Sequence, residues 1–394
     1  NTTSAPFTVT LPAGTAGDVI AFADYAATWQ TNNVTVAPNG TDKIGSLNEN
    51  ATLETEGQSV TFVFVDSTQG WINTMDSTSN VRGAPPFIVA TGGTITCEGN
   101  FKIHTFTGPG TFEVTSTASC ATVNKIDYLV VAGGGGSTGT AGSGAGAGGF
   151  RLSNDTCMSA PQTSPLATPT GITASVASFP IVVGAGGTRP DPNTPQAPAG
   201  SVSSGLGISS AGGGGGVAGG VTGQNGASGS GGGGEGPGPA GSGNTPPVSP
   251  SQGNPGGAGG SAPSNRGAGG GGGAGASGVA GTTNGGAGGI GSFVVATGFG
   301  GSNGEAGPVS GTRYFAGGGG AGFEAYCGSN GAGGIGGGGD AGPGPGTSPG
   351  NGQNGVVNTG GGGGGGSRGS PGTSSGQLGG SGGSGIVIIR YKFQ

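Results

Sequence analysis

Few residues in this chain have side chains that could catalyse a reaction. His104 is the only histidine, and it lies in a strand-like segment between Phe101 and Phe106, which favours a structural role. A single histidine nearly excludes a Ser-His-Asp set or a multi-histidine metal site. We therefore expect no catalytic residue, no metal and no enzymatic activity.

A glycine-rich motif raises the question of a nucleotide cofactor. Residues 144–149 match the G-x-G-x-x-G pattern and follow a strand-like segment. The dinucleotide fingerprint also requires a helix directly after the loop, whose N-terminus binds the pyrophosphate. Residues 150–155 show no helical period, and the chain contains no Gly-Lys-Ser or Gly-Lys-Thr. We expect no cofactor.

Two further sets of residues have both a structural and a binding interpretation. The two tryptophans, Trp29 and Trp71, are expected in a core or an interface, with sugar stacking as the alternative. Carboxylates are scattered through the first 66 residues, and solvated surface is expected for them, with a weak Ca²⁺ site as the alternative. These carboxylates are Asp18, Asp24, Asp42, Glu54, Glu56 and Asp66.

The four cysteines favour disulfides over a metal site. They have no C-x-x-C spacing, and their even count is typical of paired cysteines in an extracellular chain. Residues 101–106 and 111–117 flank the turn-like Thr107–Gly110 and predict a hairpin. That register places Cys97 opposite Cys120 and predicts a disulfide between them. By the chain-entropy model, this disulfide would stabilise the folded state by about 3 kcal/mol. By elimination, Cys157 then pairs with Cys327.

N-x-S/T sequons mark candidate glycosylation sites. They occur at Asn1, Asn33, Asn39, Asn50 and Asn154, four of them within the first 52 residues. Chance matches are common in a chain rich in Thr and Asn, and such motifs mean little in a bacterial or phage product.

Glycine dominates residues 133–385. Of the 106 glycines, 12 precede Gly133 and none follows Gly385, so 94 lie in this tract. Ordering it costs on the order of a few hundred kcal/mol of backbone entropy. Few apolar side chains are available, so backbone hydrogen bonds between segments must contribute heavily. Extended helices with three residues per turn have no internal hydrogen bonds and point every N–H and C=O outward. We predict a polyglycine II helix bundle, because the glycine blocks break the strict triplets that collagen requires.

Charge and hydropathy argue against two classes of binding partner, nucleic acids and membranes. Only 28 residues are charged, the formal net charge is −6, and no basic patch exists, so nucleic-acid binding is not expected. No apolar run approaches the roughly 18 residues of a membrane span, and membrane insertion is not expected. The sequence starts at Asn1 without Met, and no signal peptide remains at its start.

Alternating apolar residues predict β-structure on both sides of the tract. Residues 7–11, 19–22, 34–36 and 60–65 read as strands of a small sandwich or barrel. Residues 386–391 are predicted to form a strand beside 126–132. The chain would then leave this sheet before the glycine tract and return to it afterwards. The predicted fold is mainly β with a polyglycine II bundle and almost no α-helix. Its parts are an N-terminal β-domain (1–86), a β-hairpin region (87–132), the bundle (133–385) and a closing strand (386–394).

The end motifs of the tract resemble a known family. Residues 126–136 (IDYLVVAGGGG), 148–151 (GGFR), 385–391 (GIVIIRY) and 102–108 (KIHTFTG) are similar to the glycine-rich domain of bacteriophage tail fibres, which also occurs in aquatic bacteria. Residues 7–72 are similar to β-modules upstream in such fibres. Some phage adhesins of this class carry a polyglycine II bundle whose loops recognise host surface receptors. The resemblance implies that role, and an extracellular or virion-surface location.

Two function classes remain open. The first is a structural fibre subunit that binds copies of itself through the β-domains, with the edge residues Phe7, Val9 and Leu11 as the candidate assembly contact. The second is an adhesin tip that recognises a cell-surface glycan or protein of a host. Ice binding would need a regular row of Thr or small residues, and no such period is visible. We favour the fibre subunit.

Overall fold

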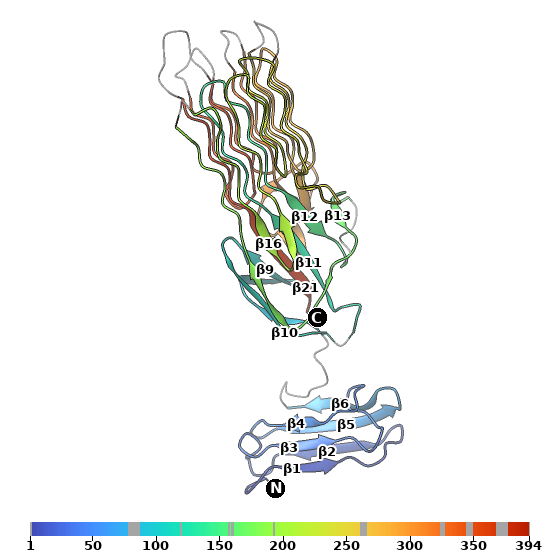
Figure 1. Cartoon of the computed structure of the whole chain (residues 1–394). Coiled ribbons are helices and arrows are strands. Elements are labelled where there is room, and N and C mark those ends of the chain that lie inside the picture. The colour runs from blue at the N-terminus through green and yellow to red at the C-terminus, as the bar shows by residue number, and fades with distance from the viewer. Residues whose placement is uncertain are drawn as a thin grey trace. The chain divides into compact units, whose positions relative to one another are not determined.

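The chain forms two compact units. The computed structural model describes residues 2–77, 87–118, 120–156, 158, 161–191, 194–260, 266–323, 328–343, 350–367 and 377–393. One unit consists of residues 1–87 with 117–120, and the other of residues 88–116 with 121–394 (Figure 1). Within the described ranges the only helical element is a π-type turn over Ala296–Gly300. The fold is therefore mainly β with almost no helix, as predicted.

The N-terminal unit contains two three-stranded sheets. Its strands are β1 (Phe7–Thr10), β2 (Val19–Ala23), β3 (Val34–Ala37), β4 (Ala51–Leu53), β5 (Ser59–Asp66) and β6 (Gly70–Asp76). One sheet has the order β1-β3-β4 and the other β2-β5-β6. Alternation along β3 and β5 buries Val34, Val36, Val60 and Phe62, while the residues between them remain partly exposed. These four side chains form part of one apolar core.

The second unit contains the remaining strands. They are β7 (Val89–Thr91), β8 (Thr94–Glu98), β9 (Phe101–Phe106), β10 (Gly110–Ser116), β11 (Lys125–Val131), β12 (Phe150–Ser153), β13 (Ala167–Thr168), β14 (Ile172–Thr173), β15 (Ala177–Ile181), β16 (Ser203–Gly205), β17 (Ile208–Ser210), β18 (Ser292–Val295), β19 (Glu305–Ala306), β20 (Thr312–Phe315) and β21 (Ile386–Lys392). A seven-stranded sheet has the order β13-β12-β11-β21-β9-β8, with β14 also paired to β11. Smaller sheets are β15-β10-β7, β16-β17 and β18-β20-β19. No helix of the described residues has the length and apolarity to cross a membrane.

The predicted closing strand is confirmed. Strand β21 lies antiparallel to β11, with Ile126 opposite Tyr391 and Val131 opposite Ile386. The chain therefore leaves the large sheet after Val131 and returns to it at Ile386. These two central strands hold both ends of the glycine tract together.

The predicted hairpin of residues 101–106 with 111–117 is wrong. Strand β9 pairs with β21 and β8, whereas β10 pairs with β15 and β7. The turn at Thr107–Gly110 thus carries the chain from one sheet to another. The physical reason is burial. Strand β10 covers one face of the large sheet, where Phe112 packs against His104 of β9 and Tyr391 of β21, so it cannot also pair with β9 within that sheet.

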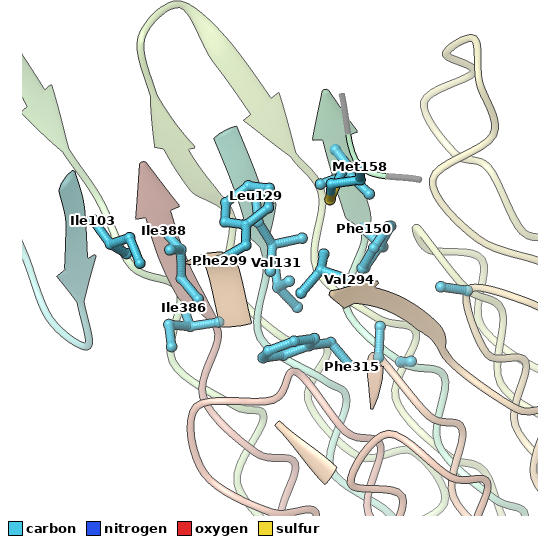
Figure 2. Close-up of a cluster of buried hydrophobic side chains, with 14 residues drawn as sticks. Ile103, Leu129, Val131, Phe150, Met158, Val294, Phe299, Phe315, Ile386 and Ile388 are labelled. Atoms are coloured by element: carbon cyan, nitrogen blue, oxygen red, sulfur yellow. The ribbon is translucent and has the colours of Figure 1, made fainter. Parts of the chain in front are cut away.

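One apolar cluster of the second unit lies on one face of β11 and β21. Leu129 and Val131 stand opposite Ile388 and Ile386 in the sheet register. Figure 2 shows these side chains gathered with others from neighbouring elements. The remaining labelled residues are Ile103, Phe150, Met158, Val294, Phe299 and Phe315. This cluster anchors the base from which the glycine-rich segments extend.

Short extended segments fill most of residues 132–385, and we call them the glycine bundle. They lie side by side beyond the strands (Figure 1). Segment 142–149 is buried within the bundle, and its backbone hydrogen bonds show how neighbouring segments are joined. Its N–H groups bond to three neighbours in turn: Gly142, Ala145 and Gly148 to the carbonyls of Gly366, Gly363 and Gly360; Ser143, Gly146 and Gly149 to those of Val217, Gly214 and Ala211; Gly144 and Ala147 to those of Gly269 and Gly272. Donors three residues apart therefore reach the same neighbour.

The carbonyl groups of segment 142–149 follow the same three-residue repeat. They accept from three other segments: Gly142 and Ala145 from the N–H groups of Gly322 and Gly319; Gly144 and Ala147 from those of Gly231 and Ser228; Gly146 and Gly149 from those of Gly135 and Ala132. With three neighbours as acceptors and three as donors, six segments surround this one. Its backbone hydrogen bonds all run between segments and none within it.

Close approach of these backbones explains the need for glycine. A Cβ added to Gly144 would lie 1.9 Å from the carbonyl oxygen of Gly319, and one added to Gly271 would lie 1.8 Å from that of Ala145. Real Cβ atoms do not approach an oxygen so closely. Residues with side chains are therefore tolerated in the bundle only where the next segment stands further away.

Candidate functional site

The N-terminal unit has an apolar cleft at the open edge of its two sheets. Strands β1 and β2 are both edge strands, one in each sheet. The cleft beside them has a volume of about 150 Å³. It is lined by Thr2, Phe7, Val9, Phe22, Ala23, Asp24, Tyr25, Ala26, Trp29 and Val34. The lining is mostly apolar and includes three aromatic side chains besides Trp29.

The predicted contact residues of β1 differ in accessibility. Phe7 is 40% exposed and Val9 is half-buried against the core, so both reach the cleft. Leu11 is only 1% exposed and belongs to the core, which removes it from the predicted contact surface. Tyr25, which was not among the predicted contact residues, is 95% exposed at the cleft. No periodic signal marks Tyr25, because it lies in the turn after β2.

Both tryptophans belong to the core. Trp71 is 1% exposed, and its ring meets that of Phe64 edge-on with centroids 5.5 Å apart. Trp29 is 5% exposed and forms part of the cleft wall. Sugar stacking on either ring would need a face that this packing covers, so the core interpretation applies.

Most of the carboxylates that were candidates for Ca²⁺ accept backbone hydrogen bonds instead. Asp18 accepts from the N–H of Thr15 at 2.8 Å, and Asp42 from that of Gly14 at 2.9 Å. Asp24 accepts from Trp29 and Gly57, and Asp66 from Thr68 and Gln69, while Glu54 and Glu56 are exposed. Burial opposes ionisation of Asp24, but these backbone N–H groups outweigh it and lower its pKa. Within the described ranges no three acidic, His or Cys side chains converge as metal ligands would.

The predicted disulfide between Cys97 and Cys120 is not formed. Both thiols are exposed, and Cys97 stands opposite Lys102 in the β8–β9 pair. The register that placed it opposite Cys120 depended on a β9–β10 hairpin, and those strands belong to different sheets. Cys157 and Cys327 lie outside the described residues.

The sequon asparagines differ in their surroundings. Asn39 and Asn50 are exposed, and Asn33 and Asn154 are half-buried. The Asn154 amide bonds to Met158 twice, accepting from its N–H at 2.6 Å and donating to its carbonyl at 3.2 Å. Asn1 lies outside the described residues. The sequence could not rank these sites, because a sequon carries no information on burial.

His104 has a structural role, as predicted. It is fully buried, with Nδ1 2.7 Å from the Gly92 carbonyl and Nε2 3.0 Å from the Tyr391 hydroxyl. Nδ1 must donate to the carbonyl. In the neutral imidazole, which burial favours, Nε2 then accepts from the hydroxyl. Burial lowers the pKa of His104 and raises that of Tyr391 to about 12.

Arg390 and Asp127 form a buried ion pair that was not predicted from the sequence. The guanidinium lies between the rings of Phe101 and Phe299, 4.4 and 4.6 Å from their centroids. Its Nη2 is 3.4 Å from Asp127 Oδ2. Asp127 also accepts from Thr156 and from Ser153 Oγ. One feature of the sequence could have indicated this pair: Asp127 and Arg390 carry opposite charges within the two apolar runs that were predicted to pair.

Several contacts keep Asp127 ionised. Burial opposes its ionisation, but the Asp155 N–H at 2.8 Å, the Thr156 hydrogen bonds and the charge of Arg390 outweigh burial and lower the pKa of the carboxyl. The pair joins neighbouring positions of β11 and β21. It therefore fixes the two strands at which the glycine tract begins and ends.

Comparison with known proteins identifies the family of the larger unit. A family model described as a glycine-rich domain matches residues 106–392, which is more than half of the chain. The match begins at the end of β9 and ends with β21, so it includes the central strands and the whole bundle. No curated protein matches the chain. The chain belongs to the glycine-rich domain family.

Proposed function

We propose that this protein is a structural subunit of an extracellular or virion fibre and catalyses no reaction. In this proposal copies associate through the N-terminal unit, and the glycine bundle forms a stiff rod. The observation that carries it is the apolar cleft between edge strands β1 and β2, with Phe7 and Tyr25 exposed beside it. An edge strand with free backbone groups and an apolar cleft is suited to receive a segment of another chain.

The glycine bundle is, in this proposal, a polyglycine II bundle. Three observations support this assignment: donors three residues apart reach one neighbour, segment 142–149 has six neighbours, and its hydrogen bonds are all between segments. Helices with three residues per turn produce this repeat. Each buried N–H then has a partner without side-chain packing.

Side-chain amides cover part of the bundle surface. The Asn351 and Asn354 side-chain oxygens accept from the N–H groups of Leu378 and Ser381, at 2.9 and 2.8 Å. Asn225 accepts from the N–H of Ser242 at 2.7 Å. Backbone donors bonded in this way are not open to another chain. This favours the N-terminal unit over the bundle as the polymerising element.

The test compares two exposed apolar side chains on opposite edges of the N-terminal unit. Tyr25 lies at the cleft, and Met75, which is 71% exposed, lies on β6 at the far edge of its sheet. We expect Tyr25→Ala to shorten fibres or lower the sedimentation coefficient of assemblies, and Met75→Ala to leave both unchanged. Equal effects of the two substitutions, with both unfolding at the wild-type temperature, would remove the cleft as the contact.

A receptor-binding adhesin tip is the second candidate. The supporting observation is a bend at residues 282–284 of the bundle, which exposes two Thr and one Asn side chain. Hydroxyl and amide groups on a rigid support suit recognition of a glycan or a protein surface. Binding of the full chain to host cells, lost on substitution of this bend and kept by Tyr25→Ala, would favour the tip over the fibre subunit.

A further inference from the structure

The structure places two sequons together at one end of the sheet β1-β3-β4. Asn39 follows the end of β3, and Asn50 immediately precedes β4. Val36 of β3 stands opposite Ala51 of β4 in antiparallel register, so these two asparagines lie at the same end of the strand pair. Both are exposed, and neither lies within a strand. Asn50 therefore has a free approach for a large modifying group.

We propose that Asn50 and Asn39 carry N-linked glycans, which requires that the chain be made in a cell whose secretory pathway transfers lipid-linked oligosaccharides, and not as a bacterial or phage product. The sequence Asn50-Ala51-Thr52 supplies the acceptor amide and the hydroxyl of the motif, and Asn39-Gly40-Thr41 does the same. In the reaction, Asn Nδ2 bonds to C1 of the first sugar of a lipid-linked oligosaccharide. The bond from C1 to the pyrophosphate oxygen breaks, the lipid pyrophosphate leaves, and the amide loses one proton.

Burial separates these two sites from Asn154. Among the described residues, the Asn50 side chain has no hydrogen-bond partner. Asn39 Nδ2 donates to the Leu11 carbonyl at 3.2 Å, and a glycosylated amide keeps one N–H for this bond. Asn154 is half-buried, and its amide oxygen and nitrogen both bond to Met158. A glycan attached to Asn154 would have to displace the residues that pack around its amide, so we expect no glycan there.

The proposed glycans lie apart from the apolar cleft. The cleft lining includes neither Asn39 nor Asn50 nor their sequon threonines. Asn33, by contrast, directly precedes Val34, which lines the cleft. Glycans at Asn39 and Asn50 would therefore shield the end of the sheet and leave the cleft open.

The test is mapping of glycosylated asparagines in the full chain purified from its natural source. Peptide-N-glycosidase F in H₂¹⁸O converts each glycosylated asparagine to labelled aspartate, and a parallel digest without the enzyme measures the label that spontaneous deamidation of Asn39-Gly40 adds. Trypsin cleavage after Lys43 separates Asn39 from Asn50, and fragment spectra separate Asn33 from Asn39. We expect label at Asn50 and Asn39 and none at Asn154. Unlabelled Asn50, or label at Asn154 instead, would overturn the proposal.

Two variants of the full chain secreted from a eukaryotic cell extend the test. Thr52→Ala removes the sequon of Asn50, while Thr52→Ser keeps it at the same half-exposed position. We expect Thr52→Ala to lose the mass of one glycan and Thr52→Ser to retain it. An unchanged mass for Thr52→Ala would show that Asn50 is not an acceptor.

Discussion

Arg390 and Asp127 stand opposite each other on β21 and β11, with Nη2 and Oδ2 3.4 Å apart and both side chains buried. They join the strand that enters the glycine tract to the strand that leaves it. Two buried charges are costly to desolvate, and breaking such a pair leaves one charge without compensation. The pair therefore makes the pairing of these strands highly sensitive to substitution.

Replacing Arg390 by Met should destabilise the second unit by about 3–5 kcal/mol, because Asp127 would remain as an uncompensated buried charge. Chemical denaturation followed by circular dichroism measures the change. The control is Lys125→Met, whose partner Asp155 is 3.9 Å away at a partly exposed site. An exposed pair is worth about 0–1 kcal/mol. Equal losses for both variants would contradict a special role for Arg390.

The second unit should lose stability as the pH falls below 6.5, the ordinary pKa of histidine. The folded-state pKa of His104 is lowered, so the unfolded chain binds more protons and stability rises with pH. The stabilisation is complete above 6.5 and is lost toward and below the lower folded-state pKa. Protonation would also leave the Tyr391 hydroxyl without its acceptor. Thermal unfolding between pH 5 and 7 measures the slope, which His104→Gln should flatten.

Asp127 adds a second acid-sensitive step. Its pKa is lowered from the ordinary value of 3.8, so its contribution is present above that value and is lost as the pH falls below it. Asp127→Asn should reduce the loss of stability in this lower range without altering the step between pH 5 and 7. A variant that changed both steps equally would show that the two groups are coupled.

Alanine in place of Gly144 should disrupt the bundle. The added Cβ would lie 1.9 Å from the Gly319 carbonyl oxygen, so two buried backbones must separate. Overpacking of this kind costs about 1–3 kcal/mol or more. Gly220→Ala is the matched control, because its nearest neighbour atom is 3.5 Å from the added Cβ. Differential scanning calorimetry should show a lower transition for Gly144→Ala and an unchanged one for Gly220→Ala.

Cys97 and Cys120 should react with a maleimide in the native protein, because both thiols are exposed. Peptide mapping after labelling without denaturant identifies the modified residues. Resistance of both thiols until a reductant is added would show that they form a disulfide after all.

Local patterns predicted the β-structure where side chains determine the pairing. Alternation gave the strands at Phe7, Val34 and Val60, and two apolar runs gave the pairing of β11 with β21. The pattern failed at Thr107–Gly110, since a turn sequence does not tell whether the next strand joins the same sheet. The disulfide prediction depended on that hairpin and failed with it.

The arrangement within the glycine bundle could not be predicted. The segments around residues 142–149 come from positions as distant as 132 and 366, and most of their residues lack a side chain. Backbone groups are alike along a glycine run, so they specify no partner and no register. The Arg390–Asp127 pair and the Tyr25 cleft were likewise missed, because each depends on residues brought together only by the fold.

The most direct test of the proposed function is electron microscopy of the full chain beside a chain that lacks residues 1–86. If copies associate through the N-terminal unit, the full chain should form fibres. The truncated chain should remain dispersed, with its bundle still folded by circular dichroism and calorimetry. Fibres of normal length from the truncated chain would contradict the account and would make the glycine bundle itself the polymerising element.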